Sequence, residues 1–328
     1  MCIRDSFNSD GKMDFVVTAM FADTGPANNR KNGCDVYLYQ GDGRLQGELD
    51  RAQLPASTGA LTLEGERGGD FLGTEIFTAD VNGDGIDDLL IGAQNLDLVS
   101  GNTMLRDNCG GVYVLLGRRG IFQGNPTLDL RTDNRDLIRI LGAETGERAG
   151  VWVDSGDLDG DGFMDILIGA DQFPAAPRGQ DPRIRSGKVY VIYGRSRFPA
   201  LLDLAEETDN MSIILGRDSG DHLGSTLHAR DLDGDGKDEL IAAAALGRLS
   251  AALAARGHRI TVITRSGGGT APRVEGVEVV SVGWVPLPMA FTRSYGRSAM
   301  RALRHLHARD RVDVVHLHCP MISWSAKQ

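Results

Sequence analysis

The 328-residue chain has little of what several protein classes require. Its four cysteines, Cys2, Cys34, Cys109 and Cys319, are too few for a disulfide scaffold and have no metal-ligand spacing. The longest apolar runs, such as 241–246, are far shorter than the ~20 residues that a membrane-spanning helix needs, so no transmembrane segment is expected. Hydrophobic residues still make up 41% of the chain, which is enough for packed cores and too much for a disordered protein.

Positive charge is also scarce, and it is unevenly distributed. The net charge of −10 argues against a nucleic-acid partner for the whole chain. Residues 247–328 carry 12 Lys and Arg against 4 Asp and Glu, whereas residues 1–246 carry a large excess of acidic side chains. Such an asymmetry indicates two parts with different roles.

The acidic part of the chain contains an internal repeat. A loop with the pattern Asp-x-Asn/Asp-Gly-Asp-Gly recurs, with an acidic residue at its ninth position; the copies are 80–88, 157–165, 231–239 and a partial one at 8–14. The Asp before the second glycine recurs in steps of 74, 77 and 74, and a Val-Tyr pair recurs at residues 36, 112 and 189. Two markers in register indicate a structural unit of about 75 residues.

Each unit is predicted to consist of short β-strands. The segments flanking the loops are rich in β-branched and aromatic residues, and three or four of them fit into each repeat. The predicted strands are 75–79, 88–92, 112–116 and 189–193, with a further one per repeat at 61–63, 137–141 and 212–215. This arrangement favours a β-propeller blade over a helical solenoid.

The acidic loops predict a Ca²⁺ site in each repeat. Oxygen-bearing side chains at positions 1, 3 and 5 converge where a glycine at position 6 allows the chain to curl, position 7 offers a carbonyl, and position 9 closes the shell. Oxygen ligands without His or Cys favour Ca²⁺ over Zn²⁺. The predicted ligands are Asp80, Asn82, Asp84, Ile86 and Asp88; Asp157, Asp159, Asp161, Phe163 and Asp165; Asp231, Asp233, Asp235, Lys237 and Glu239; and Asn8, Asp10, Lys12 and Asp14.

Two alternatives compete with a calcium site of this kind. An EF-hand requires a bidentate Glu at position 12 and flanking helices, but position 12 is Ile91, Ile168 or Ala242 and the flanks are predicted strands. A Gly-Asp turn without a metal ion stays open as the simpler alternative.

These residues resemble a known repeat. Phe71-Leu-Gly73 before the loop and Ile91-Gly-Ala93 after it look like the FG-GAP repeat of integrin α-subunit propellers, and similar pairs recur across residues 7–245. The resemblance implies a seven-bladed propeller with Ca²⁺ in its blade hairpins, of which about three blades are present here. It also implies an extracellular or cell-surface protein with protein or glycan ligands, used for adhesion or attached to hydrolases such as lipid-anchor phospholipases.

The basic part has a different pattern. Predicted helices at 249–256 and 297–307 alternate with strands at 259–264, 277–282 and 312–318, which is typical of a Rossmann-like parallel sheet. Residues 247–328 resemble the N-terminal domain of family 4, GT-B-fold glycosyltransferases, which implies a cytoplasmic nucleotide-sugar enzyme. His316 and His318 would then form either a metal or acid–base pair or the polar end of a strand.

The sequence therefore predicts a mainly β fold, with a partial, about three-blade FG-GAP propeller at 7–245 and a partial α/β Rossmann-like segment at 246–328. Residues 1–6 are interpreted as a non-native stub, and the junction near residue 245 as a chimeric one. The expected function is a non-catalytic, calcium-binding module of an adhesion or cell-surface protein, without catalytic residues. The alternative is a glycosyltransferase, incomplete here, that moves sugar to a lipid or polymer acceptor.

Overall fold

The computed structural model divides the chain into two compact units, Met1–Ala245 and Leu246–Gln328. The residues it describes are 2–24, 30, 32–43, 60–101, 103–123, 127–132, 134–173, 183–206, 210–231, 234–243, 260–265 and 277–282.

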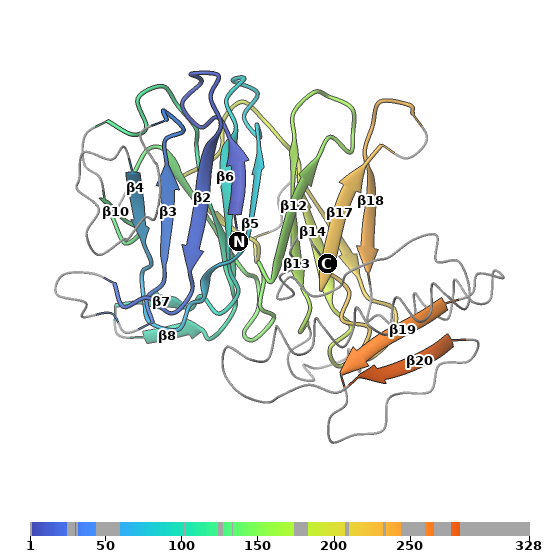
Figure 1. Ribbon diagram of the computed structural model, residues 1–328. Coiled ribbons are helices and arrows are strands. Elements are labelled where there is room, and N and C mark those ends of the chain that lie inside the picture. The colour runs from blue at the N-terminus through green and yellow to red at the C-terminus, as the bar shows by residue number, and fades with distance from the viewer. Residues whose placement is uncertain are drawn as a thin grey trace. The chain divides into compact units, whose positions relative to one another are not determined.

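The first unit is a succession of antiparallel sheets, three of them meanders of four strands (Figure 1). Sheet 1 contains β1 (Cys2–Asp5), β2 (Asp14–Ala19), β3 (Asp35–Tyr39) and β4 (Ala60–Glu64). Sheet 2 contains β5 (Leu72–Ala79), β6 (Asp88–Ala93), β9 (Gly111–Leu115) and β11 (Leu137–Leu141). Sheet 3 contains β12 (Trp152–Gly156), β13 (Asp165–Ala170), β14 (Lys188–Ile192) and β16 (Met211–Leu215). Hairpin 4 contains β17 (Thr226–Arg230) and β18 (Glu239–Ala243).

Short strands link consecutive sheets. On the way from β9 to β11, the chain forms β10 (Thr127–Asp129), which pairs in parallel with β4 of the preceding sheet. On the way from β14 to β16, it forms β15 (Leu201–Asp203), which pairs in parallel with β11. A separate small hairpin is formed by β7 (Leu98–Ser100) and β8 (Thr103–Arg106).

The hydrophobic core lies between the sheets. One cluster joins sheets 1 and 2, a second joins sheets 2 and 3, and a smaller third joins sheet 3 to hairpin 4. Every residue of β6 and of β13 is buried, because both faces of sheets 2 and 3 are covered. Burial of both faces explains why the sequences of these strands are nearly continuous apolar runs, without alternation of apolar and polar residues.

Close approach of neighbouring sheets accounts for part of the glycine content. A Cβ at Gly92 would collide with the carbonyl of Gly150, just before β12, and a Cβ at Gly169 would collide with that of Gly224, just before β17. Only glycine allows the backbones to approach this closely.

The predicted β character of residues 7–245 is confirmed, since the described part of this unit holds strands and no helix. No helix in the described residues is long and apolar enough to cross a membrane. Residues 1–6 are interpreted above as a non-native stub, but most of this segment takes part in the fold. Cys2–Asp5 forms β1, which pairs with β2. The foreign origin of residues 1–6 stays a prediction.

In the second unit, β19 (Ile260–Arg265) and β20 (Val277–Val282) form a parallel pair. Their positions agree with the predicted strands, and parallel pairing agrees with the predicted sheet type. The predicted helices at 249–256 and 297–307, the strand at 312–318, His316 and His318 lie outside the described residues. The Rossmann-like architecture therefore stays a prediction.

Candidate metal centre

Every acidic loop connects the first two strands of a sheet. The loop lies between β1 and β2, β5 and β6, β12 and β13, and β17 and β18, and its ninth position is the first residue of the second strand. The loops are therefore equivalent hairpin turns, as their regular spacing in the sequence predicts.

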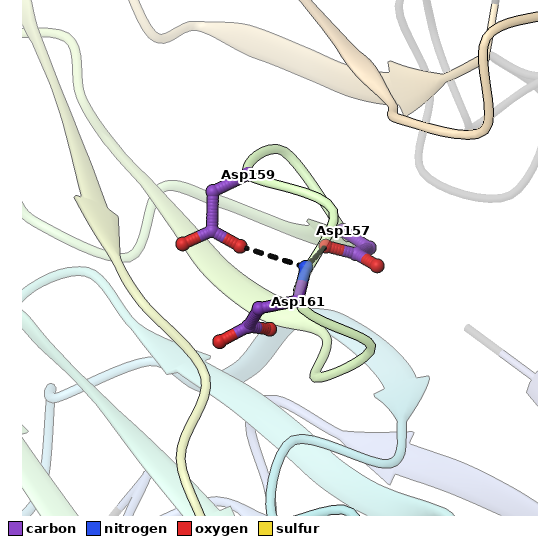
Figure 2. A group of neighbouring side chains, drawn as sticks. All are labelled: Asp157, Asp159 and Asp161. Carbon is purple, nitrogen blue, oxygen red and sulfur yellow. Dashed lines mark hydrogen bonds between the residues drawn. The ribbon is translucent and has the colours of Figure 1, made fainter.

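The loop of sheet 3 brings together the predicted ligands at positions 1, 3 and 5. Carboxylate oxygens of Asp157, Asp159 and Asp161 all lie within 4.8 Å of one another, with Asp159 and Asp161 exposed and Asp157 half-buried. Figure 2 shows the three side chains on the curled hairpin turn. Two like charges about 4 Å apart repel by ~4 kcal/mol at an effective dielectric constant of 20, so a cation would relieve this arrangement.

The backbone of this loop is folded around the same carboxylates. Asp157 accepts N–H bonds from Gly160 (2.7 Å), Asp161 (3.1 Å) and Gly162 (3.0 Å). Asp159 accepts one from the Asp161 N–H at 3.1 Å (Figure 2), and Asp161 accepts one from the Phe163 N–H at 2.9 Å. The turn is thus organised by hydrogen bonds from its own backbone N–H groups to its three carboxylates.

The other loops repeat parts of this pattern. In sheet 2, Asp80 and Asn82 accept the Asp84 N–H at 3.1 and 2.9 Å, and Asp84 accepts the Ile86 N–H at 2.9 Å. In hairpin 4, the Lys237 N–H donates to the Asp235 carboxylate at 2.9 Å. In the loop of sheet 1, the Lys12 N–H donates to the Asp10 carboxylate at 2.9 Å. The predicted ligand Asp233 lies outside the described residues.

The acidic residue at position 9 is placed differently from the first three ligands. Asp165 is fully buried, and its two oxygens accept the N–H groups of Leu158 and Gly194, each at 2.9 Å. Asp88 makes the equivalent bonds to Val81 (3.1 Å) and Gly117 (2.8 Å). These carboxylates tie the turn to the end of the third strand, so their part in a metal shell stays a prediction.

Burial dominates the ionisation of the position-9 carboxylates. It raises the pKa of Asp88 to about 7 and the pKa of Asp165 to about 6, although the backbone N–H groups act in the opposite direction. For Asp14, the equivalent residue of sheet 1, burial also raises the pKa.

Neighbouring loops are connected, a feature that the loop motif does not predict. The N–H of Asp238, at position 8 of its loop, donates to the Asp157 carbonyl of the preceding loop at 2.8 Å. The Asp238 carboxylate in turn accepts the Asp157 N–H at 3.0 Å. Met164 repeats the first bond to the Asp80 carbonyl at 3.4 Å. The only signal in the sequence is the regular step between these positions.

The glycines at positions 4 and 6 serve different purposes. Gly83 and Gly160, at position 4, have φ values of 72° and 77°, and a Cβ there would meet the position-7 side chain of the following loop. For Gly83 that neighbour is the Phe163 ring, at 2.5 Å. Gly85 and Gly162, at position 6, have φ values of 81° and 90°, but a Cβ there would meet no atom within 4 Å. In sheets 2 and 3, position 4 therefore needs both the left-handed backbone and the space, whereas position 6 needs only the backbone.

The strand pattern, the hairpin loops and the glycine contacts fit one repeat family. Residues 72–115 and 149–192 match the FG-GAP repeat. The chain carries FG-GAP repeats. The first matched segment runs from the start of β5 to the end of β9, and the second begins three residues before β12 and ends with β14; each contains an acidic loop. The loops at 8–14 and 231–239 lie outside the two FG-GAP segments.

Known proteins with similar sequences include phospholipases and integrins. Phosphatidylinositol-glycan-specific phospholipase D of Mus musculus is 29% identical over 199 residues, which is 61% of this chain and 21% of the relative. Integrin alpha-PS2 of Drosophila melanogaster is 33% identical over 143 residues, covering 42% of this chain and 9% of the relative. Integrin alpha-3 of Mus musculus is 30% identical over 175 residues, covering 53% and 13%. The chain thus spans about a fifth or less of these relatives.

The basic part has a match of its own. Residues 242–327 match Glycosyltransferase Family 4. This match begins inside β18, the last described strand of the first unit, whereas the second FG-GAP segment ends at residue 192.

Proposed function

We propose that the FG-GAP part of this chain is a non-catalytic, calcium-binding module of an extracellular or cell-surface protein. The observation that carries the proposal is the convergence of Asp157, Asp159 and Asp161 within 4.8 Å on a turn that their own backbone hydrogen bonds organise. The loop at 80–88 repeats these bonds, and the similarity to integrin α chains supports a propeller with protein or glycan ligands.

Calcium fits this loop by its chemistry. The donors are carboxylates and carbonyls, with no imidazole or thiolate, which suits a hard cation. Asp157, Asp159 and Asp161 would hold the ion in sheet 3, Asp80, Asn82 and Asp84 in sheet 2, and Asp231 and Asp235 in hairpin 4. Bound calcium would neutralise the clustered carboxylates and fix the hairpin turns on which the loops are built.

Titration calorimetry of the full chain with Ca²⁺ tests the proposal. We expect saturable binding at the ~10⁻⁴–10⁻³ M level of extracellular modules, and Asp161→Asn should remove one site. Asp107→Asn, an exposed aspartate outside the loops, is the matched control and should leave the stoichiometry unchanged. If addition of Ca²⁺ to the wild-type chain produced no binding heat, the proposal would be overturned.

Sugar transfer is the second candidate function, favoured by the match of residues 242–327 to Glycosyltransferase Family 4. The described part of that segment is the parallel pair β19–β20. Release of a nucleoside diphosphate from common sugar nucleotides by the purified chain, abolished by His318→Ala, would support this function. Equal release by wild-type and variant protein would reject a role for His318 in it.

A further inference from the structure

The sequence contains two Asn-Gly pairs, Asn32-Gly33 and Asn82-Gly83, and the second lies in the acidic loop of sheet 2. Asparagine is a thermolabile residue. It is most reactive before glycine, because the following backbone nitrogen can then attack the side-chain amide without hindrance from a Cβ. Asn82 stands at position 3 of its loop, where the loop of sheet 3 has Asp159.

The backbone nitrogen of Gly83 differs from its counterparts in the other loops. The equivalent glycines of sheet 3 and hairpin 4, Gly160 and Gly234, donate their N–H groups to Asp157 at 2.7 Å and to Asp231 at 2.6 Å. Among the described residues, none accepts a hydrogen bond from the Gly83 N–H, and Gly83 is exposed. No hydrogen bond therefore has to break before this nitrogen can react.

The Asn82 side chain is held next to that nitrogen. Its Oδ1 accepts the Asp84 N–H at 2.9 Å, and this bond closes a ring of atoms that contains both the Asn82 Cγ and the Gly83 nitrogen. The same N–H would stabilise the negative charge that develops on Oδ1 during an attack on Cγ. No residue in the described part of the chain binds the Asn82 Nδ2, which is the group that would leave.

The other Asn-Gly pair is held differently, although its local sequence has the same reactive feature. Gly33 is buried, and its N–H donates to the Arg30 carbonyl at 3.2 Å. Attack on the Asn32 amide would therefore require a hydrogen bond to break and the segment to open. The fold thus separates two pairs that the sequence alone does not distinguish.

We propose that Asn82 is a site of spontaneous deamidation. The Gly83 nitrogen gives its proton to hydroxide and attacks the Asn82 Cγ, the bond from Cγ to Nδ2 breaks, and Nδ2 takes up a proton and leaves as ammonia. The intermediate is a five-membered cyclic imide that joins the two residues. Water then opens the imide at either carbonyl and leaves aspartate or isoaspartate at position 82. The net reaction consumes a water molecule and releases ammonia, with no oxidation or reduction.

The aspartate product also changes the cation site, a consequence that rests on the proposed function. It gives the loop of sheet 2 carboxylates at positions 1, 3 and 5, which is the set that Asp157, Asp159 and Asp161 form in sheet 3. Ligand charge is one of the properties that set the affinity of a calcium loop. Deamidation would thus add a charged ligand to a loop that has an amide at this position.

Peptide mapping of the folded full chain, incubated at pH 8 with a chelator, tests the modification. We expect fragmentation mass spectra to show conversion of the Asn82 amide to an acid, with isoaspartate among the products. Conversion of Asn32 should be at least about fivefold slower, because burial and a hydrogen bond hold the Gly33 nitrogen. Asn82→Ser is the matched control, and position 82 should then stay unchanged.

Incubation in urea separates the effect of the fold from that of the local sequence. Both Asn-Gly pairs are exposed in the unfolded chain, so their rates should agree within about twofold. A difference as large as that of the folded chain would assign the selectivity to the flanking residues, and would overturn the role given to the loop.

Calcium titration of Asn82→Asp tests the consequence for the cation site. This variant reproduces the aspartate product, and we expect one of its sites to bind Ca²⁺ about fivefold more tightly than in the wild-type chain. Equal affinities in the two chains would contradict this consequence.

Two results with the folded chain would overturn the deamidation site itself, namely no conversion at Asn82 and equal conversion at Asn82 and Asn32. These measurements are made without calcium, so they are independent of the proposed function. Conversion at Asn82 in a chain that gives no heat with Ca²⁺ would support the deamidation site and overturn the calcium function. Calcium binding without conversion would overturn the deamidation site alone.

Discussion

The acidic loops of sheets 2 and 3 each hold two glycines in the left-handed backbone conformation, and only the first lies under a neighbouring side chain. At Gly83 the Phe163 ring of the next loop occupies the space of a Cβ, whereas the Cβ direction at Gly85 is open. By sequence, a role is predicted only for the glycine at position 6, which allows the loop to curl, and the motif carries no sign of a contact at position 4. The contact between loops makes them different.

We therefore expect Gly83→Ala to destabilise the protein by about 2–4 kcal/mol and Gly85→Ala by about 1–2 kcal/mol. Both substitutions place Cβ on a backbone with positive φ, but only the first also displaces the Phe163 ring. Urea unfolding followed by circular dichroism measures the difference. Ser9, which holds φ 57° at position 4 of the first loop, indicates that the backbone strain by itself is tolerated. Equal losses for the two variants would contradict the assigned role of the ring contact.

A buried acid outside the loops predicts a pH dependence. Asp70 is 3% exposed, and burial raises its pKa to about 7, with Glu66 and Asp97 adding to the effect. Because the folded-state pKa lies above the unfolded value of about 3.9, the contribution of Asp70 to stability is complete below that value and is lost as pH rises from there through 7.

Asp70→Asn removes this titration. Measured in the presence of a chelator, the stability of the variant relative to wild type should rise by about 2 kcal/mol between pH 5 and pH 8. Glu206→Gln, at an exposed site, is the control and should show a flat difference. The same flat difference for Asp70→Asn would mean that the carboxylate is ionised in the folded protein throughout this range.

At the level of elements, the short strands β10 and β15 join each sheet to the next. Each is anchored by an arginine from the segment between the second and third strands of the preceding sheet, Arg30 for β10 and Arg106 for β15. Such a short strand provides few hydrogen bonds of its own, so the arginine–aspartate pair carries much of the attachment.

Arg106→Gln should therefore release β15 from β11. We expect a loss of about 2 kcal/mol in unfolding free energy, since the half-buried Asp203 carboxylate and the Gly142 carbonyl lose a charged partner. Hydrogen exchange should show reduced protection of the Leu204 N–H, which bonds to the Leu141 carbonyl at 2.9 Å. Arg217→Gln, which removes an exposed pair with Asp218, is the matched control and should leave both readouts unchanged. Unaltered Leu204 protection in Arg106→Gln would contradict this role.

The same strands mark the limit of what the sequence predicts. It predicts the strand at 137–141 at its observed bounds, and those at 88–92 and 112–116 within one residue, because period, β-branched residues and flanking turns agree there. In contrast, β10 and β15 are very short and pair with a strand of another sheet, so no local pattern distinguishes them from a loop. Their signal is the repeat itself, since the Leu-Asp-Leu at 128–130 recurs at 202–204, and Arg30 is followed by Arg106, at about the step of the acidic loops. A further Leu-Asp-Leu at 96–98 does not follow this step.

For the acidic loops too, the sequence predicts some contacts and not others. Spacing alone predicts that Asp157, Asp159 and Asp161 converge, since the turn and its glycines are encoded in one short continuous segment. The bonds that Asp165 makes to the Leu158 and Gly194 N–H groups could not be predicted, because Gly194 follows the next strand of the sheet. Contacts between elements that are distant in sequence depend on the assembled sheets.

At the scale of the whole molecule, the two units differ in charge, in strand pairing and in the proteins that they resemble. Antiparallel meanders make up the first, and the described strands of the second are parallel. The glycosyltransferase similarity begins at residue 242, inside β18. These observations support the proposal that the segment around 243–248 joins two unrelated sequences.

The three apolar clusters of the first unit lead to a test of that proposal. All of their members lie between Phe7 and Ala242, so the packing described for this unit draws on nothing after β18. A chain that ends at residue 245 should therefore show the same heat of calcium binding as the full chain. Its melting temperature should lie within about 2 °C of the melting temperature at which the first unit unfolds in the full chain.

Calorimetry of the shortened chain at low and high salt separates packing from charge attraction, because the basic unit and the acidic unit attract each other less as salt screens them. A drop in melting temperature that disappears at high salt would indicate charge attraction between the units, which two unrelated sequences of opposite charge also show. A drop of about 5 °C or more that persists at both salt concentrations would indicate that the second unit stabilises the first by packing. Such packing requires surfaces shaped to fit each other, so it would count against a junction between unrelated sequences.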